Sequence, residues 1–315
     1  KQDKPAIQNH FMVYSLILAG VWVLRVPQAP ITPFMIFLHI GLAFLFLEMP
    51  RVKPDSPKAL HILAGLLPFL LWAAAWSEIG WLYRLALPEV HDGAVKAVDL
   101  VLFQVHLNEE FSSWVPWEPV RNFMGLSYLS YYLLILGPPL VLALGKRGKD
   151  LEDHTLGLLF TYLACFVIYL LMPVLGPRET IAAVGAEATG VGGLFGPVIS
   201  AFFAAGDSLG TAFPSSHCAG SVAAAILVRR HFGTGAGRLA AVWAACIVIS
   251  TVYTNNHYMV DAVAGVATAL IVHKLVDLHW TRAARLNVAA VFRDREGFAG
   301  FPGWETSTKK EKCHE

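Results

Sequence analysis

Long apolar runs separated by short polar stretches dominate the hydrophobic pattern of the chain. A helix needs roughly 17 to 25 apolar residues to cross the hydrocarbon core of a bilayer, and about eight such runs can be counted. The expected spans are 11–26, 31–48, 60–82, 122–144, 154–175, 214–229, 237–254 and 257–278. The pattern therefore predicts an all-α, polytopic membrane protein with about eight transmembrane helices.

Two segments between the expected spans have patterns of their own. Within residues 85–121, apolar residues recur at helical spacing over 94–107 (Val95, Val98, Leu102 and Val105). This spacing predicts an amphipathic helix that lies flat at the membrane interface. Residues 176–213 are rich in Gly and Ala and too broken to span, which favours a re-entrant cover over a site.

Composition supports a membrane protein, and the charge distribution orients it. The 315 residues are 56% hydrophobic and 15% charged, well below the charged fraction of about a quarter that is typical of soluble domains. A net charge of +1 gives no reason to expect a nucleic-acid partner. With eight spans, one side of the membrane carries all but five of the 24 Lys and Arg residues. The five exceptions are Arg25, Arg84, Lys96, Arg121 and Arg178. By the positive-inside rule both termini, including the tail 281–315, are cytoplasmic, and we expect a multi-pass protein of a bacterial inner membrane.

Two short histidine motifs lie where apolar helices meet polar sequence, both on the expected extracytoplasmic face. The first is Phe213-Pro214-Ser215-Ser216-His217. Proline suits the first turn of a helix, whose free N–H groups form a phosphate cradle together with the Ser215 and Ser216 hydroxyls. His217 then projects beside the bound phosphate. The alternative is a serine-capped helix start with an interfacial histidine.

The second motif is Asn256-His257-Tyr258-Met259-Val260-Asp261. His257 and Asp261 are four residues apart at an expected helix start and so share one face. The carboxylate fixes the imidazole tautomer and leaves the other nitrogen free to attack phosphorus. A carboxylate in a membrane-facing run costs roughly 2.5 to 3.5 kcal/mol, which favours a functional or paired group. The alternative is an orienting pair without a catalytic role.

Three further polar residues near these motifs are candidate phosphate ligands. The Arg178 guanidinium suits a phosphate, although an interfacial arginine that snorkels to lipid headgroups is the alternative. Asn255 and Asn256 either donate hydrogen bonds to the substrate or serve as turn residues.

These motifs resemble those of the type 2 phosphatidic acid phosphatase superfamily, which are K-x6-R-P, P-S-G-H and S-R-x5-H-x3-D. The second motif here is Pro214-Ser215-Ser216-His217, with Ser216 in place of glycine. The third is Ser250-Thr251, five residues, His257, three residues and Asp261. Thr251 stands in place of arginine, and from this motif position we expect it to contact the substrate. The spacing of both motifs matches fully.

The first motif retains only Arg178. Leu171 stands at the lysine position and Glu179 at the proline position. Such a set looks more like the branch that contains inositol phosphorylceramide synthase and sphingomyelin synthase. The resemblance covers roughly residues 60–278 and implies a six-helix catalytic core in residues 57–280, with two extra helices in residues 1–56.

The resemblance also implies the roles of the site residues. His257 is the nucleophile, Asp261 its orienting partner, His217 the acid that protonates the leaving oxygen, and Arg178 a phosphate ligand. Neither a metal nor another cofactor is implied, which agrees with the lack of a carboxylate cluster in the sequence.

Charge favours one substrate class over another. A phosphate monoester carries about 1.5 to 2 negative charges at neutral pH, whereas a diester carries one. Loss of two of the three family cations therefore favours transfer of a phospho-headgroup from a phospholipid diester to a lipid or polyol hydroxyl. The alternatives are a lipid phosphate or polyprenyl diphosphate phosphatase and, in another class, a non-catalytic transporter or scaffold.

Overall fold

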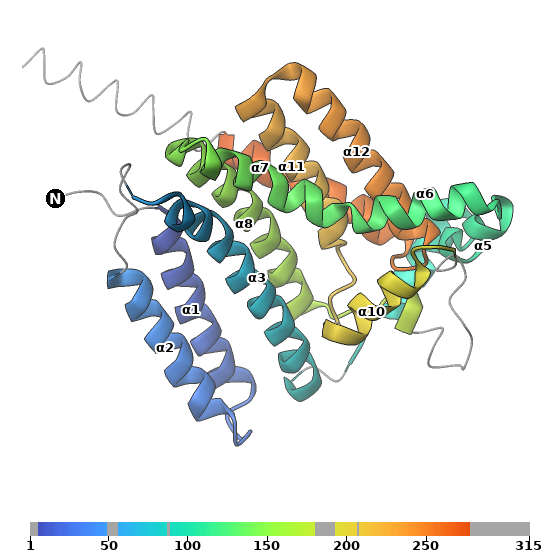
Figure 1. Cartoon of the computed structure of the whole chain (residues 1–315). Helices are drawn as coiled ribbons and strands as arrows, with labels where there is room; N and C mark the ends of the chain where they lie inside the picture. The colour runs from blue at the N-terminus through green and yellow to red at the C-terminus, as the bar shows by residue number, and fades with distance from the viewer. Residues whose placement is uncertain (1–5, 49–55, 87–88, 180–192, 207, 278–315) are drawn as a thin grey trace, which may run out of the picture. The chain divides into compact units, whose positions relative to one another are not determined.

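The computed structural model of the chain describes residues 6–48, 56–86, 89–179, 193–206 and 208–277, and these residues are nearly all helical. The helices are α1 (Ala6–Arg25), α2 (Thr32–Glu48), α3 (Lys58–Ala86), α4 (Asp92–Phe103), α5 (Leu107–Trp114), α6 (Glu118–Leu129), α7 (Tyr131–Leu144), α8 (Gly148–Leu171), α10 (Gly196–Gly206), α11 (Ser216–Phe232) and α12 (Thr234–Tyr253), and all of these except α4 are labelled in Figure 1. A final helix covers Met259–Asp277. The contacts described below lie within the compact unit Lys1–His273. The second unit, Lys274–Glu315, contributes only the last turn of the final helix to the described residues.

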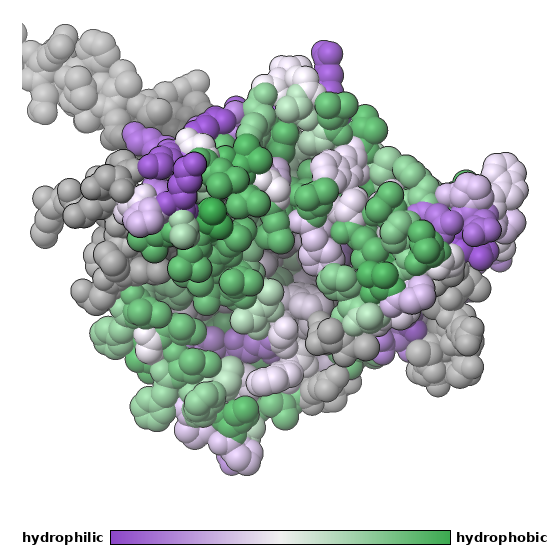
Figure 2. Space-filling view, in the orientation of Figure 1, coloured by the Kyte–Doolittle hydropathy of each residue, from purple (hydrophilic) through white to green (hydrophobic). Residues whose placement is uncertain are grey.

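Helices occupy all eight expected spans, but they differ in length and polarity. In the described part of the chain, α3, α8, α12 and the final helix are long and apolar enough to cross a membrane. A fifth span forms if α6 and α7 are counted together, and shorter apolar helices lie in α1 and α2. Apolar side chains cover large parts of the face shown in Figure 2. The prediction of an all-α, polytopic membrane protein is confirmed.

The expected span 122–144 is broken rather than straight. Its two parts, α6 and α7, are bent by 41° at Ser130. The Ser130 hydroxyl donates a hydrogen bond of 2.6 Å to the Ser127 carbonyl and accepts one of 2.7 Å from the Trp243 indole. Serine hydroxyls that bond back to the preceding turn commonly bend helices, and an added partner on another helix holds this bend in place.

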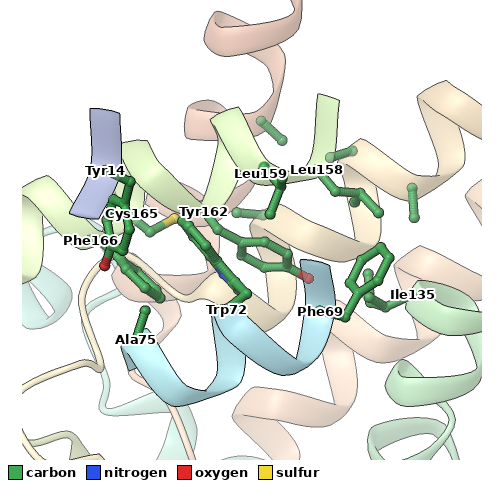
Figure 3. Packing of buried hydrophobic residues seen from close by; sticks show 14 of the residues in the cluster. Tyr14, Phe69, Trp72, Ala75, Ile135, Leu158, Leu159, Tyr162, Cys165 and Phe166 are labelled. Carbon is green, nitrogen blue, oxygen red and sulfur yellow. The ribbon is translucent and has the colours of Figure 1, made fainter. Parts of the chain in front are cut away.

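The largest hydrophobic cluster lies around α8, which contacts α1, α3, α7 and α11. Figure 3 shows its aromatic centre, where the rings of Trp72 and Phe166 stack with their centroids 4.3 Å apart and the tilted ring of Tyr162 lies 5.5 Å from that of Trp72. Cys165 is fully buried beside them. This packing fixes α3 and α8 relative to each other beneath the site described below.

The two N-terminal helices are joined to α3 by a buried polar cluster. Glu78 of α3 is only 8% exposed, and its Oε1 accepts a hydrogen bond from the indole N–H of Trp22 in α1. The same oxygen lies 2.7 Å from Nε2 of His39 in α2. Because buried polar groups are costly unless they are paired, these contacts specify how α1 and α2 dock on α3.

The predicted amphipathic helix is present as α4, and part of its apolar stripe faces outward. Asp92, Val95 and Asp99 are its buried residues, whereas Val98 is 48% and Leu102 59% exposed. The helix ends earlier than expected because Gln104 adopts a left-handed backbone with φ of 63°. The carboxylates of α4 therefore point into the protein, toward the loops that carry the candidate site.

Candidate active site

A cavity of about 290 Å³ brings together residues from both histidine motifs and from the loop after α8. The rings of His217 and His257 lie 6.1 Å apart between centroids. The lining residues are Trp76, Tyr128, Tyr132, Leu175, Arg178, Phe202, Ser208, Thr211, Ala212, Ser216, His217, Asn256 and His257. Five of them belong to the segment 176–213 predicted to cover a site: Arg178, Phe202, Ser208, Thr211 and Ala212. Residues 180–192 of that segment lie outside the described residues.

The first motif starts α11, and Ser215 is its N-cap. The Ser215 Oγ accepts a hydrogen bond of 3.3 Å from the backbone N–H of Cys218, and its own N–H donates to the Asp261 carbonyl at 3.0 Å. Ser215 is fully buried and does not line the cavity, whereas Ser216 does. The capping alternative therefore describes Ser215, which connects the two motifs through the backbone, and only Ser216 is placed to contact a substrate.

His217 is held between two tyrosine rings. Its ring stacks on Tyr128 of α6 at 5.1 Å and lies 4.4 Å from the ring of Tyr131 of α7. The Tyr131 hydroxyl lies 2.6 Å from that of Tyr162 in α8, which restrains its ring. The buried Nε2 of His217 has no hydrogen-bond partner among the described residues. An oriented imidazole with an unsatisfied nitrogen at a cavity wall is suited to proton transfer to or from a bound ligand.

His257 precedes the final helix, which begins at Met259, so the expectation that it shares a helical face with Asp261 is wrong in detail. The two side chains still meet, with His257 Nδ1 3.5 Å from Asp261 Oδ2. This distance exceeds the usual 2.7–3.2 Å of an N–H···O hydrogen bond, and contacts of this kind often tighten only when substrate binds. Asp261 is fully buried, and the same Oδ2 accepts a 2.9 Å bond from the Tyr258 N–H.

The surroundings of His257 favour its neutral form. Burial lowers the pKa of His257 from its usual 6.5 to about 4, opposed by a hydrogen bond with the Ala212 backbone and assisted by the nearby positive charge of Arg178. A neutral imidazole keeps a lone pair on one of its two ring nitrogens. This is the state that a histidine nucleophile requires.

Arg178 is the one Lys or Arg among the cavity-lining residues that the structure describes. Its Nη2 lies 3.2 Å from Glu179 Oε1, and its side chain is only 22% exposed. A partly buried guanidinium that shares a cavity with two histidines is better placed to bind an anion there than to snorkel to the membrane surface.

The structure brings Asn256 to the cavity but leaves Thr251 and Asn255 outside its wall. Thr251 is fully buried, and its hydroxyl donates to the Val248 carbonyl at 2.8 Å. Asn255 has a left-handed backbone (φ 59°), and its Oδ1 accepts a 2.7 Å bond from Asn108. Asn255 is thus a turn residue that anchors the His257 loop to α5, and Thr251 contributes no charge or polar atom to the cavity.

The sequence prediction missed the two carboxylates of α4, Asp92 and Asp99. Asp92 Oδ2 accepts from the N–H of Leu175 at 2.9 Å, and Oδ1 accepts from that of Gly176 at 2.9 Å. Asp99 Oδ1 accepts from the N–H of Val260 at 2.8 Å. The two carboxylates therefore hold the loop before Arg178 and the turn after His257. Their presence in a membrane-associated apolar segment was the available signal, because ionisable residues there are rarely without a partner.

An apolar groove of about 300 Å³ adjoins the cavity and shares Trp76, Tyr132, Ser216 and His217 with it. Its other walls come from α3, α7 and α8, and they include Phe69, Leu70, Trp72, Ala73, Tyr131, Ile135, Leu136, Tyr162 and Phe166. Leu70 is 64% exposed at its outer edge. The groove therefore leads from the lipid-facing surface of α3 to His217.

A comparison with protein families matches residues 100–275, more than half of the chain, to the PAP2 superfamily. The chain belongs to the PAP2 superfamily. No curated protein and no solved structure matches the sequence significantly. The matched region of this PAP2 protein begins within α4 and includes Arg178, both histidine motifs and Asp261, but it excludes α1, α2 and α3.

Membership of the PAP2 superfamily supports a phosphatase-type enzyme that acts on lipid-type substrates in a membrane. The resemblance to the superfamily predicted from the motifs is thereby confirmed. The finer resemblance to inositol phosphorylceramide and sphingomyelin synthases stays a prediction, as do the division at residues 56 and 280 and the orientation in the membrane.

Proposed function

We propose that this PAP2 protein is a membrane lipid phosphotransferase that moves a phospho-headgroup from a phospholipid diester to a hydroxyl acceptor. One observation carries the proposal. The cavity that holds His217, His257 and Arg178 continues into an apolar groove that is open at the surface of α3. A diacyl lipid fits this arrangement, with its phosphate at the polar end and an acyl chain along the groove.

In the proposed first step the Nε2 of His257 attacks phosphorus, and the bond between phosphorus and the diacylglycerol oxygen breaks. His217 donates a proton to that oxygen, and diacylglycerol leaves. The bound anion favours the protonated state of His217 that this step needs, since an opposite charge close by stabilises an imidazolium. Arg178 binds the non-bridging oxygens, and Asp261 orients His257 and stabilises its positive charge.

In the second step the acceptor hydroxyl gives its proton to His217 and attacks the phosphorus attached to His257. The nitrogen–phosphorus bond breaks, and His257 returns to its neutral state. Water at the same position would release the phospho-headgroup instead, so transfer and hydrolysis share every group except the acceptor.

The number of cations at the cavity favours a diester over a monoester. The family positions occupied by Leu171 and Thr251 supply no charge, and neither residue lines the cavity. Arg178 alone balances the single charge of a diester, whereas a monoester with about 1.5 to 2 charges would be bound with less compensation. A lipid phosphate or polyprenyl diphosphate phosphatase is therefore the second candidate function.

The test uses the purified full chain and measures two reactions side by side. One is release of diacylglycerol from a diester phospholipid with and without a long-chain or polyol alcohol; the other is phosphate release from phosphatidic acid. We expect the diester reaction to depend on the alcohol and to be lost in His257→Ala. His61→Ala is the control and should keep the activity, because His61 lies in α3 and does not line the cavity. Much faster hydrolysis of the monoester would replace the transferase proposal with a phosphatase. No turnover of either substrate would favour the non-catalytic alternative.

A further inference from the structure

A second cavity, a groove of about 600 Å³, lies between α11 and α12, which run side by side in Figure 1. It extends along α11 from Val222 to Arg229 and along α12 from Thr234 to Ile249, and Val266 of the final helix completes it. Arg229 follows His217 by 12 residues in one helix, so its backbone is about 18 Å from the candidate active site at 1.5 Å per residue. The groove is thus separate from the cavity assigned to the reaction.

The groove has a charged end and a long apolar wall. Arg229 and Arg238 lie at the end near the connection of the two helices, while Ala241, Ala245 and Ile249 continue along α12. The apolar residues line a path of about 16 Å between positions 238 and 249 at helical rise. A cationic end joined to an apolar path of this length is complementary to an amphiphile with an anionic head.

Arg229 and Arg238 differ from nearby arginines in their ion-pair partners. Arg230 Nη1 pairs with Asp153 at 3.2 Å, and Arg147 Nε pairs with Asp150 at 2.8 Å. Within the described residues, by contrast, no carboxylate lies within ion-pair distance of the two groove arginines, both of which are exposed. Among the described residues, the positive charge at this end of the groove therefore has no carboxylate partner.

A glycine allows the two helices to pack closely at the charged end of the groove. Gly237 of α12 packs directly on Arg229, and a Cβ atom added to it would lie 2.7 Å from the Arg229 Cα and would overlap the start of its side chain. Only a residue without a side chain allows α12 to approach α11 so closely. The stem of Arg229 is thus packed against the helix pair, which limits the directions in which its guanidinium extends.

We propose that this groove binds an anionic glycerophospholipid, with its phosphate between Arg229 and Arg238 and one acyl chain along the alanine side of α12. A free phosphate would use the arginines but leave the apolar wall unoccupied. A second copy of the chain would cover the apolar wall, yet it would have to bury two uncompensated guanidinium groups, at a considerable free-energy cost. A lipid satisfies both ends, and its site is independent of the transferase proposal.

The first test measures binding through thermal stability of the purified full chain in zwitterionic detergent micelles. A ligand that binds only the folded state raises its unfolding temperature. We expect phosphatidylglycerol to raise it more than phosphatidylcholine does, and inorganic phosphate to have no comparable effect. In the double variant Arg229→Gln and Arg238→Gln, the apparent affinity for phosphatidylglycerol should fall about tenfold to hundredfold, since two charge-assisted contacts are lost.

The matched control removes the same number of positive charges nearby but outside the groove, in Lys149→Gln combined with Arg230→Gln. This variant should keep the preference for phosphatidylglycerol within about threefold of wild type. An equal loss in both double variants would show general charge attraction to the micelle and overturn the proposal. An equal shift with inorganic phosphate alone would also overturn it, because no lipid would then be needed.

The second test blocks the apolar part and leaves both arginines intact. Ala245→Trp should displace the acyl chain and lower the amount of anionic lipid that copurifies, as measured by native mass spectrometry. Leu239→Trp is the control, since Leu239 lies on the same helix, is 75% exposed and does not line the groove. Unchanged lipid in Ala245→Trp, or an equal decrease in Leu239→Trp, contradicts the proposed position of the acyl chain. The comparison of Ala245→Trp with Leu239→Trp also tests lipid binding in the groove if the double arginine variant does not fold.

Discussion

Replacing Asp92 by alanine removes one carboxylate that accepts three hydrogen bonds. Asp92 is only 6% exposed, and its acceptor contacts are the N–H groups of Leu175 and Gly176, each at 2.9 Å, and the Tyr258 hydroxyl at 3.3 Å. Two of these donors lie just before Arg178, and the third belongs to the residue after His257. Asp92 is therefore a positioning residue that couples the two loops of the candidate site.

The size of the effect follows from the donors that would lose their partner. A buried donor left unsatisfied costs about 1–3 kcal/mol, so the two backbone N–H groups alone correspond to about 2–6 kcal/mol, and water entering the vacated space offsets part of this. A net loss of about 3 kcal/mol that falls on the catalytic geometry would lower kcat/KM by about 100-fold. Asp92→Asn keeps one acceptor oxygen, so we expect it to recover part of the loss.

The assay compares kcat and KM for the lipid reaction at a temperature below the unfolding midpoint of every variant. Glu109→Gln serves as the control, because it removes a carboxylate of the neighbouring helix α5 that makes an exposed ion pair of 3.5 Å with Lys96. We expect the control to stay within about twofold of wild type, as is usual for such pairs. A folded Asp92→Ala variant with kcat/KM within about threefold of wild type would refute the positioning role.

Three further predictions concern protonation, packing and topology. Because burial lowers the pKa of His257 to about 4, kcat/KM for an aryl phosphodiester should stay constant from pH 7 to about pH 5 and fall only near pH 4; a midpoint near 6.5 would contradict the neutral buried imidazole. The same shift means that the folded state loses stability as pH falls from 6.5 toward 4, since the unfolded chain binds the proton first. Gly265→Ala should lower the free energy of unfolding by about 1–3 kcal/mol or more, and with it the unfolding temperature, because its Cβ would overlap a backbone carbonyl of the first histidine motif. Gly41→Ala is the control: its Cβ would meet nothing within 4 Å, so the change should be neutral or stabilising in a thermal melt. A membrane-impermeant thiol reagent should label Glu109→Cys in intact cells and Lys149→Cys only after permeabilisation, and the reverse pattern would invert the predicted orientation.

The sequence predicted the helices and the proximity of several residues of the candidate site. Apolar runs of sufficient length mark spans whatever their neighbours are, and every expected span is helical in the structure. The expected topology placed both histidine motifs on one face of the membrane, and the structure places the rings of His217 and His257 6.1 Å apart between centroids. Arg178, which lies near the start of the predicted cover segment 176–213, lines the same cavity.

Contacts between distant segments could not be predicted from local patterns. Asp92 accepts hydrogen bonds from Leu175 and Gly176, which follow it by 83 and 84 positions, and Asp99 accepts one from Val260, which follows it by 161. No periodicity in the sequence encodes these pairs. The same limit applies to Thr251, whose motif position suggested a substrate contact, although its hydroxyl bonds within its own helix.

The central claim is that His257 forms a covalent bond to phosphorus, and trapping this intermediate tests it most directly. His217→Ala removes the group that activates the acceptor, while an aryl phosphodiester supplies a leaving group that needs no proton, so the intermediate should accumulate. After an alkaline quench, which preserves phosphohistidine-type bonds, peptide mass spectrometry should find the phosphoryl adduct on His257. The double variant His217→Ala with His257→Ala should carry no adduct. Release of the aryl alcohol with no adduct on His257, or an adduct on another residue that persists in the double variant, would contradict the account.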